Sequence, residues 1–80
     1  MKIYDEKYLV NIVRQGEPMS IPFCELKAGD HLQTVNGTAL VCGTDAHVSG
    51  DADYEGWIVF DEYGEGYFPE DFGAPLRSEL

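Results

Sequence analysis

No run of apolar residues in this sequence approaches the roughly 18 that are needed to cross a membrane. The first ten residues, MKIYDEKYLV, also lack the apolar segment of a secretory signal. Only two cysteines are present, Cys24 and Cys42, and their spacing is not that of a CxxC pair. These absences predict a cytoplasmic protein without membrane contact, in which both thiols act as small apolar side chains.

Positive charge is scarce and unevenly placed. Five lysines and arginines face fifteen carboxylates, so the formal net charge is −10, and no lysine or arginine lies between Lys27 and Arg77. Such a surface repels nucleic acid and anionic membranes and attracts basic partners, although solubility alone also explains it. The acids of that stretch are Asp30, Asp45, Asp51, Asp53, Glu55, Asp61, Glu62, Glu65, Glu70 and Asp71.

Length limits the class of function. Eighty residues predict one domain, residues 1–80. A chain of this size buries only roughly 60–65% of the surface that its unfolded form exposes. The core is therefore thin, with no room for a deep catalytic cavity, which favours binding over catalysis and predicts that the protein is not an enzyme.

The first half of the chain predicts short strands joined by turns. Residues 8–13, YLVNIV, are β-branched and aromatic, with apolar side chains on both faces. A helix over residues 3–13 remains the alternative, because several apolar residues there also fit a helical period. Residues 15–18 have turn chemistry, and a strand over 19–23 follows, which Pro22 places at an edge or a bulge.

The second half continues the same pattern. A turn at residues 28–30 precedes a hairpin whose turn is Asn36-Gly37, the strongest short hairpin signal in the chain. Residues 43–56 are polar and acidic and predict a long loop. Residues 57–60 and 66–68 predict a second hairpin, residues 69–72 a helical turn, and residues 73–80 a frayed tail. The predicted fold class is therefore mainly β.

Two stretches resemble Src homology 3 domains. They are ELKAGDHL at residues 25–32 and the closing segment 56–72, which runs from a tryptophan-bearing strand to GYFPEDF. The resemblance implies a small barrel of about five to six strands, here with a long acidic loop and one short helical turn near the C-terminus. The chain departs from the family because it lacks the ALYDY stretch, carries Phe72 without a hydroxyl, and is longer over residues 36–55.

The same resemblance implies a groove for proline-rich peptides whose floor includes Trp57, Pro69 and Phe72. A ridged aromatic surface accepts a preformed polyproline helix at low entropic cost. We expect Tyr54 and Tyr67 to lie beside this groove, and Phe60 and Phe68 to fill the core. The acids expected to steer and pair a basic or proline-containing protein partner are Asp51, Asp53, Glu55, Glu62 and Glu70.

Two alternatives use the acidic loop itself. In an extended segment Asp51, Asp53 and Glu55 point to one side about 6–7 Å apart, as an acidic DNA mimic that inhibits a nucleic-acid-binding protein would require. The stretch from Asp51 to Glu62 also matches a calcium-loop pattern, with acids at its first, third and fifth positions, but no helix flanks it. Weak calcium binding is the second alternative, and a chance match is favoured over it.

Other chemistry-bearing residues lack convincing patterns. Cys24, His31, Cys42 and His47 do not have the closely paired spacing of a zinc site. Cys42, Asp45 and His47 include the residue types of a nucleophile, an orienting acid and a base, but they lie too close together along one loop. The sequence therefore predicts no cofactor, metal or catalytic site and no direct contact with nucleic acid, and it leaves the oligomeric state open.

Overall fold

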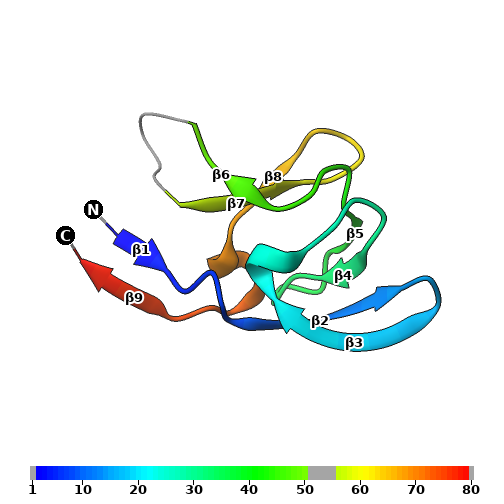
Figure 1. Ribbon diagram of the computed structural model, residues 1–80, viewed down its shortest axis with the longest axis horizontal. Coiled ribbons are helices and arrows are strands. Elements are labelled where there is room, and N and C mark those ends of the chain that lie inside the picture. The colour runs from blue at the N-terminus through cyan, green and yellow to red at the C-terminus, as the bar shows by residue number, and fades with distance from the viewer. Residues whose placement is uncertain (1, 51–55, 80) are drawn as a thin grey trace.

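The computed structural model describes residues 2–50 and 56–79, which form nine short strands, two 3-10 helices and three antiparallel sheets (Figure 1). The mainly β class is confirmed. The strands are β1 (Lys2–Tyr4), β2 (Leu9–Arg14), β3 (Glu17–Pro22), β4 (His31–Gln33), β5 (Ala39–Val41), β6 (His47–Val48), β7 (Trp57–Phe60), β8 (Gly66–Tyr67) and β9 (Leu76–Glu79), and the 3-10 helices are η1 (Phe23–Glu25) and η2 (Pro69–Phe72).

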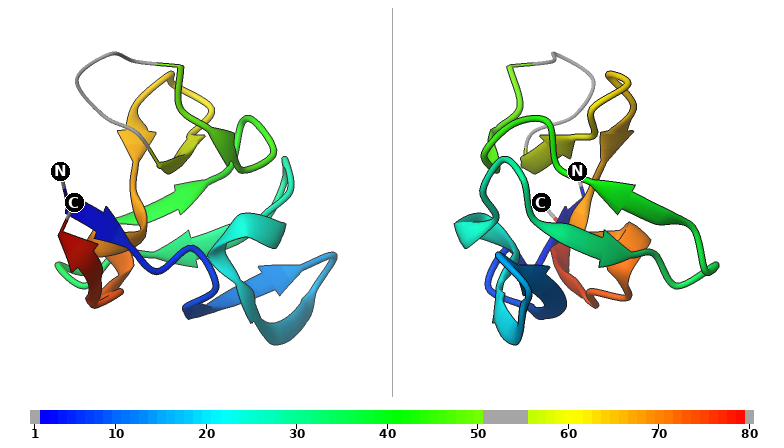
Figure 2. Two further views of the ribbon diagram at one scale, coloured as in Figure 1. Left: turned by 60° about the vertical axis from the view of Figure 1, so that its left-hand side comes forward. Right: turned by 90° about the vertical axis from the view of Figure 1, so that its right-hand side faces the viewer.

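The three sheets occupy different parts of the molecule. A four-stranded sheet has the order β3-β2-β4-β5, a three-stranded sheet has the order β6-β7-β8, and β1 pairs with β9. In Figure 1 the three-stranded sheet lies above the four-stranded sheet, and the β1–β9 ribbon extends to the left. Figure 2 shows from two other directions that the two ends of the chain lie side by side in this ribbon.

Burial along β2 alternates residue by residue. Val10 and Ile12 are buried, whereas Leu9, Asn11 and Val13 are exposed. This period of two is that of a strand with one face on the core, so the predicted strand is confirmed and the helical alternative is wrong. The strand is apolar on both faces, and its outer face stays open to solvent.

A two-residue turn joins β2 to β3. Gln15 and Gly16 have φ angles of 52° and 80°, the left-handed conformation that tight hairpin turns require at both central positions. The predicted turn over residues 15–18 is therefore two residues too long, because β3 already begins at Glu17. The prediction that Pro22 lies on an edge strand is confirmed, since β3 ends the four-stranded order.

Asn36-Gly37 lies in the predicted hairpin turn, between β4 and β5. The Gly37 amide donates to the Thr34 carbonyl and the Thr34 amide donates to the Thr38 carbonyl, both at 2.9 Å. Gly37 has a φ of 88°, which lets the chain re-enter the ladder after the turn. The hairpin predicted from the residues Asn36-Gly37 is therefore confirmed.

Three other expectations are wrong in detail. The segment 43–56, expected as a loop, includes β6, which pairs with β7 through His47–Ile58 and Val48–Trp57. The tail, expected to be frayed, forms β9 against β1. The described residues form more strands than the five to six expected, and their pairing does not show closure into a barrel.

The core lies between the sheets and is small, as the chain length requires. In β7 the two central residues Ile58 and Val59 are both buried, while Phe60 is only half-buried, as is Phe68. The expectation that Phe60 and Phe68 fill the core is therefore wrong. The clustered core residues are Val10, Ile12, Phe23, Leu26, Leu32, Leu40, Cys42, Val59 and Phe72.

A partly buried ion pair connects the end of β2 to the start of β4. The Arg14 Nε and Nη2 atoms donate to the two carboxylate oxygens of Asp30, each at 2.8 Å, and the Lys27 amide donates to Asp30 Oδ2 at 2.8 Å. Only 1% of the Asp30 side chain is exposed. Arg14 Nη2 also donates to the Glu25 carbonyl at 3.3 Å, so one guanidinium holds β2, η1 and the following turn together.

Asp30 remains charged in this setting. Burial by itself raises the pKa of Asp30, but the hydrogen bonds from Arg14 and from the Lys27 amide outweigh it, and the pKa lies below its ordinary value. The pair is bidentate, the geometry that gives charge-assisted hydrogen bonds their largest strength. The carboxylate is therefore a structural element, although it belongs to the acidic stretch.

We expect Asp30→Asn to lower the free energy of unfolding by about 2–3 kcal/mol, because the substitution leaves Arg14 without its charged partner. The wild-type advantage is present above the unfolded-state pKa of about 3.9 and is lost as the pH falls through the lower folded-state pKa. Urea unfolding at about pH 7 and about pH 3 measures this difference. The control is Glu65→Gln at an exposed carboxylate, and an equal effect of both variants at neutral pH would contradict the assigned role of Asp30.

A glycine marks the contact between the two larger sheets. The Gly43 amide donates to the Phe60 carbonyl at 2.7 Å, and Cys42 and Asp61 form an isolated β-bridge beside it. A Cβ atom on Gly43 would lie 2.5 Å from the Asp61 carbonyl oxygen, closer than real Cβ contacts. Only glycine fits this position without moving one sheet away from the other.

We therefore expect Gly43→Ala to lower the free energy of unfolding by about 2 kcal/mol or more, because the new methyl group meets backbone rather than a side chain that can move. The matched control is Gly50→Ala, since no atom lies within 4 Å of the Cβ that it would add. Thermal unfolding of the two variants compares the positions. A Gly43→Ala protein as stable as Gly50→Ala would show that the sheets are not in this contact.

Candidate functional site

The predicted contact residues do not form one open aromatic surface. Pro69 and Phe72 are buried, and Trp57 and Tyr67 are partly buried against the core. The Phe72 ring lies 5.8 Å from the Phe23 ring and 6.2 Å from the Tyr67 ring, between centroids, so it belongs largely to the interior.

The predicted acids fall into two groups. Glu62 and Glu70 lie in the part of the chain that the structure describes, and both are exposed. The predicted contact residues Asp51, Asp53, Tyr54 and Glu55 lie outside the described residues.

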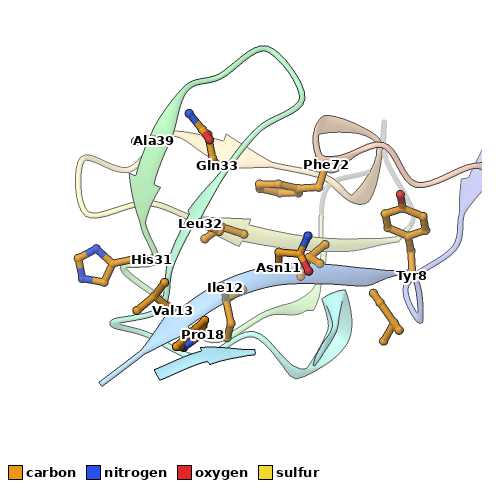
Figure 3. Close-up of a pocket in the computed structure, with 12 residues that line it drawn as sticks. Tyr8, Asn11, Ile12, Val13, Pro18, His31, Leu32, Gln33, Ala39 and Phe72 are labelled. Atoms are coloured by element: carbon orange, nitrogen blue, oxygen red, sulfur yellow. The ribbon is translucent and has the colours of Figure 1, made fainter. Parts of the chain in front are cut away.

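A groove opens instead beside β2 and β4 of the four-stranded sheet, between exposed side chains of the sheet and core residues such as Ile12, Leu32 and Phe72 (Figure 3). Its volume is about 620 Å³. It lies where β2 and β4 diverge, because these strands pair only through Ile12–Leu32 and Val13–His31. The Phe72 ring enters from η2, opposite the β2 residues. The lining residues are Tyr8, Leu9, Val10, Asn11, Ile12, Val13, Pro18, His31, Leu32, Gln33, Ala39 and Phe72, and together they are called the sheet groove below.

The sheet groove is apolar and holds no carboxylate, lysine or arginine. Leu9 is 60% exposed and Val13 is 40% exposed, although both are side chains that usually avoid water. The polar side chains of the lining are Tyr8, Asn11, His31 and Gln33. The Asn11 Oδ1 already accepts the Ser20 hydroxyl at 2.5 Å. The Gln33 Nε2 already donates to the Gly37 carbonyl at 2.9 Å, which fixes the orientation of that amide. On a chain of net charge −10, this uncharged surface stands apart.

A second hollow of about 430 Å³ adjoins the sheet groove and shares His31, Leu32 and Ala39 with it. It lies between β5 and the turn that joins β7 to β8. Two carboxylates and two phenol rings line that turn side, and no lysine or arginine is among the lining residues. The lining residues are His31, Leu32, Thr38, Ala39, Leu40, Val41, Asp61, Glu62, Tyr63 and Tyr67, and they are called the β5 hollow below.

Asp61 organises the turn side of the β5 hollow. Its Oδ1 accepts the amides of Tyr63 and Glu65, each at 2.9 Å, and its Oδ2 accepts the Tyr67 hydroxyl at 3.4 Å. The carboxylate thus has the role of a turn-forming aspartate. It fixes a negative charge at the base of an exposed turn, where Tyr63 is 87% exposed.

The pKa of the Tyr67 hydroxyl is affected by this negative charge. Burial raises the pKa of the Tyr67 hydroxyl, and the neighbouring carboxylates Asp61, Glu65 and Asp71 raise that pKa further. A phenol surrounded by carboxylates resists ionisation because a second negative charge would be repelled. The same field favours a positive group that approaches the ring.

Several other acids bond to backbone amides rather than facing a partner. Asp71 Oδ2 accepts the Phe68 amide at 2.8 Å at the start of η2, and Asp45 Oδ1 accepts the Ala28 amide at 3.0 Å. With Asp30 and Asp61, four of the ten acids between Lys27 and Arg77 shape turns in this way. The charge of this stretch is therefore partly a consequence of its turns.

Cys42 does not have the properties of a nucleophile. Burial raises the pKa of its thiol to about 12, and the nearby carboxylate of Asp30 contributes. His47 Nδ1 lies 2.9 Å from the Asp45 carbonyl and its ring stacks on Phe60 at 5.8 Å between centroids. An activated thiol needs the opposite shift, so the Cys42, Asp45 and His47 set is not arranged for nucleophilic catalysis.

Residues 2–50 and 56–79 bring together no group of three histidine, cysteine or acidic side chains able to hold a metal ion. Both cysteines are free thiols, with Cys42 buried and Cys24 half-buried. The zinc set considered from the sequence is therefore not assembled in this part of the chain.

Sequence reasoning did not identify the sheet groove. Its residues are Tyr8, which precedes β2, and members of β2, β3, β4, β5 and η2, and the pairing of the strands brings them together. One signal was present, because residues 8–13 are apolar on both faces of a predicted strand. Of the predicted contact residues, Phe72 lines the sheet groove, and Tyr67 and Glu62 line the β5 hollow.

We expect Cys42 to resist alkylation in the folded protein, because its thiol is buried and has a raised pKa. Iodoacetamide treatment at mildly alkaline pH, followed by peptide mass spectrometry, measures the modification of each cysteine. Labelling of Cys42 should appear only after denaturant is added, with Cys24 as the internal comparison. Rapid labelling of native Cys42 would contradict this account and would revive the nucleophile hypothesis.

No protein-family model, curated protein or solved structure matches this chain. The relationship to Src homology 3 domains therefore stays a prediction from the residues at 25–32 and 56–72. Within the described part of the chain, no helix has the length and apolar character needed to span a membrane.

Proposed function

We propose that this protein is a non-enzymatic interaction module that binds an extended, basic segment of another protein in the sheet groove. The observation that carries the proposal is the contrast between the groove and the rest of the chain. The groove lining holds no carboxylate, lysine or arginine, whereas the chain as a whole has a formal net charge of −10. The partner is therefore expected to combine apolar anchors with lysine or arginine.

The exposure of Leu9 and Val13 supports an apolar anchor. Each side chain keeps a large part of its area in water, and covering apolar area contributes about 25 cal/mol per Å². Both side chains lie on the outer face of β2, with Pro18 of β3 paired opposite Val13. Between them lies the polar pair of Asn11 and Ser20, whose hydroxyl donates to Asn11 Oδ1, so this face offers two apolar anchor sites on either side of a polar contact.

An extended segment suits the shape of the site. The groove follows strands rather than closing into a pocket, and Phe72 and Tyr8 stand along its length (Figure 3). A proline-containing segment is preformed in an extended helix and loses little entropy on binding. The predicted family relationship points to the same class of ligand, through a different set of residues.

Charge supports the choice of a basic partner. The adjoining β5 hollow presents Glu62 and the fixed carboxylate of Asp61, with no lysine or arginine in its lining. Opposite charge steers encounters and selects against acidic competitors, an effect that is weakened by salt. Apolar contacts would then slow dissociation of the partner, and charge would speed its association and select basic partners.

The two sequence-based alternatives lack a comparable observation. The acidic row of a DNA mimic depends on Asp51, Asp53 and Glu55, which lie outside the described residues, as do three ligands of the calcium-loop pattern. Within that pattern residues 57–60 form strand β7. Competition by duplex DNA and the addition of Ca²⁺ separate these alternatives from the proposed groove in one assay.

We expect the double variant Leu9→Ser/Val13→Ser to weaken binding of a labelled peptide containing leucine, proline and arginine by roughly tenfold or more. The reason is the lost burial of two apolar side chains, and each 1.4 kcal/mol is a factor of ten in affinity. Fluorescence anisotropy measures the affinity. The matched control is Val48→Ser, because Val48 is 61% exposed but lies on β6, outside the groove lining.

The outcomes separate the hypotheses. Equal weakening by the groove variant and by Val48→Ser would show that the groove is not the binding surface. Binding that is unchanged by Leu9→Ser/Val13→Ser and by Val48→Ser, and that is lost in high salt or with duplex DNA, would favour the acidic DNA-mimic hypothesis over the groove. Binding that requires Ca²⁺ would favour the loop hypothesis.

A further inference from the structure

The two edges of the four-stranded sheet differ in their capacity to accept another strand. On β3 the prolines Pro18 and Pro22 pair with Val13 and Leu9 in an unbroken ladder. A proline has no amide hydrogen, so it fits such a ladder only where its nitrogen faces away from the partner strand. Both prolines therefore face the outer edge of β3 and block it. Natural sheets use this device to prevent unwanted strand addition.

The opposite edge is β5, which carries no proline. The bonds at the two ends of the β4–β5 hairpin fix its register. The Thr34 amide donates to the Thr38 carbonyl at one end, and the Cys42 amide donates to the Asp30 carbonyl at the other, each at 2.9 Å. Antiparallel pairs alternate between bonded and non-bonded positions. Counting inward from either end places Ala39 at a position whose amide and carbonyl face away from β4.

Val41 lies at the same kind of position, two residues along the strand. Its carbonyl accepts the Glu62 amide at 3.1 Å, which confirms that this edge faces the β7–β8 turn. Beyond that bond and the Cys42–Asp61 bridge, no strand pairing joins β5 to the β7–β8 hairpin in the described residues. The amide and carbonyl of Ala39 and the amide of Val41 are left pointing toward the β5 hollow.

The β5 hollow provides the space that such an edge needs. It extends along Thr38, Ala39, Leu40 and Val41 on one side and along the β7–β8 turn on the other. The hollow has a volume of about 430 Å³ and lies beside the backbone groups of β5 that face away from β4. On β3 a smaller hollow of about 310 Å³ also includes Pro18 and Ser20, but a proline lies two residues from Ser20 on each side and interrupts the row of outward amides.

We propose that the β5 edge binds an extended basic segment of a partner protein as an added strand, through the amide and carbonyl of Ala39 and the amide of Val41. Strand addition derives affinity from main-chain bonds and specificity from alternate side chains. The proposal goes beyond binding in the sheet groove, because it names a second surface and a different mode of recognition.

The chemistry of the flank selects a basic strand. A lysine or arginine that projects from the added strand meets the exposed Glu62 carboxylate and the exposed Tyr63 ring, which offers a cation–π contact. Asp61 adds a negative charge that its hydrogen bonds to the amides of Tyr63 and Glu65 hold in place. An acidic strand would be repelled by both carboxylates.

The test uses a fluorescein-labelled peptide that alternates lysine and valine, and the variant Ala39→Pro. This substitution copies the placement of Pro18 and Pro22, so it removes an outward amide without removing a bond to β4. We expect it to weaken binding of the peptide by roughly tenfold, because one main-chain bond is lost and the proline ring obstructs the edge. The matched comparison is Ala39→Val, which keeps the amide but enlarges a side chain that lines both hollows, so an equal loss of binding in the two variants would assign the effect to the side chain and contradict strand addition.

A second measurement does not depend on the variant folding. With the wild-type protein, a version of the peptide that is N-methylated at alternate residues is expected to bind roughly tenfold more weakly, since it has lost donors on one edge. Hydrogen exchange at the Ala39 and Val41 amides should slow when the unmethylated peptide is bound. Equal affinity for both peptides, with unchanged exchange at these two amides, overturns strand addition at β5.

Because Ala39 also lines the sheet groove, the two surfaces are distinguished by Leu9→Ser/Val13→Ser together with the N-methylated peptide. Weaker binding of the lysine–valine peptide to Leu9→Ser/Val13→Ser, with no effect of N-methylation, supports the groove and contradicts the edge. Weaker binding of the N-methylated peptide, with no effect of Leu9→Ser/Val13→Ser, supports the edge and contradicts the groove as the docking surface. An alternating glutamate–valine peptide that binds as tightly as the lysine–valine peptide would contradict the selection for positive charge.

Discussion

The bidentate pair between Arg14 and Asp30 is the interaction on which the four-stranded sheet depends. β2 and β4 share only two paired positions, a short ladder for strands that carry much of the core. The guanidinium extends this junction beyond the ladder, because it also reaches the carbonyl of Glu25 at the end of η1. A charged pair of this kind contributes little net stability compared with an apolar replacement. Separating its two partners is costly, however, because the buried carboxylate is then left without a counter-charge. Its value here is that it specifies one arrangement of strand, turn and helix.

That arrangement determines where the molecule can be open. β2 and β4 cross at Ile12–Leu32 and Val13–His31 and then separate, so apolar side chains on β2 have no covering strand. On the other side of β4, strand β5 ends the sheet, and the β7–β8 turn stands apart from it except near Cys42 and Asp61. The sheet groove and the β5 hollow are thus two consequences of the same short strands. A chain of 80 residues has too few strands to cover both faces and both edges of its sheets.

The sequence was most informative where structure is decided locally. The turn at Asn36-Gly37, the 3-10 turn after Phe68 and the edge position of Pro22 follow from backbone preferences of a few residues. Strands β6 and β9 were not predicted, because each depends on pairing with another strand. β9 pairs with β1 at the other end of the chain, and β6 has only two residues, His47 and Val48, which pair with β7. The candidate site has the same origin. Phe72 and Leu9 lie more than sixty residues apart, yet they line one groove. Composition predicted an acidic surface correctly, but it did not reveal that Asp30, Asp45, Asp61 and Asp71 accept hydrogen bonds that hold turns and the β2–β4 junction.

The β1–β9 ribbon has a consequence for mechanical load. Lys2 lies opposite Glu79, so a force applied to the two ends of the domain enters the ribbon at one end and acts across its hydrogen bonds. In this geometry the bonds open one after another, as in a zipper, whereas strands pulled in shear share the load among all their bonds. The ribbon would therefore peel apart at low force and lengthen the connection before the Arg14–Asp30 junction is stressed. Tension on the chain would thus be absorbed in the ribbon before it reaches Tyr8 and Phe72, which line the sheet groove next to the ribbon in the chain.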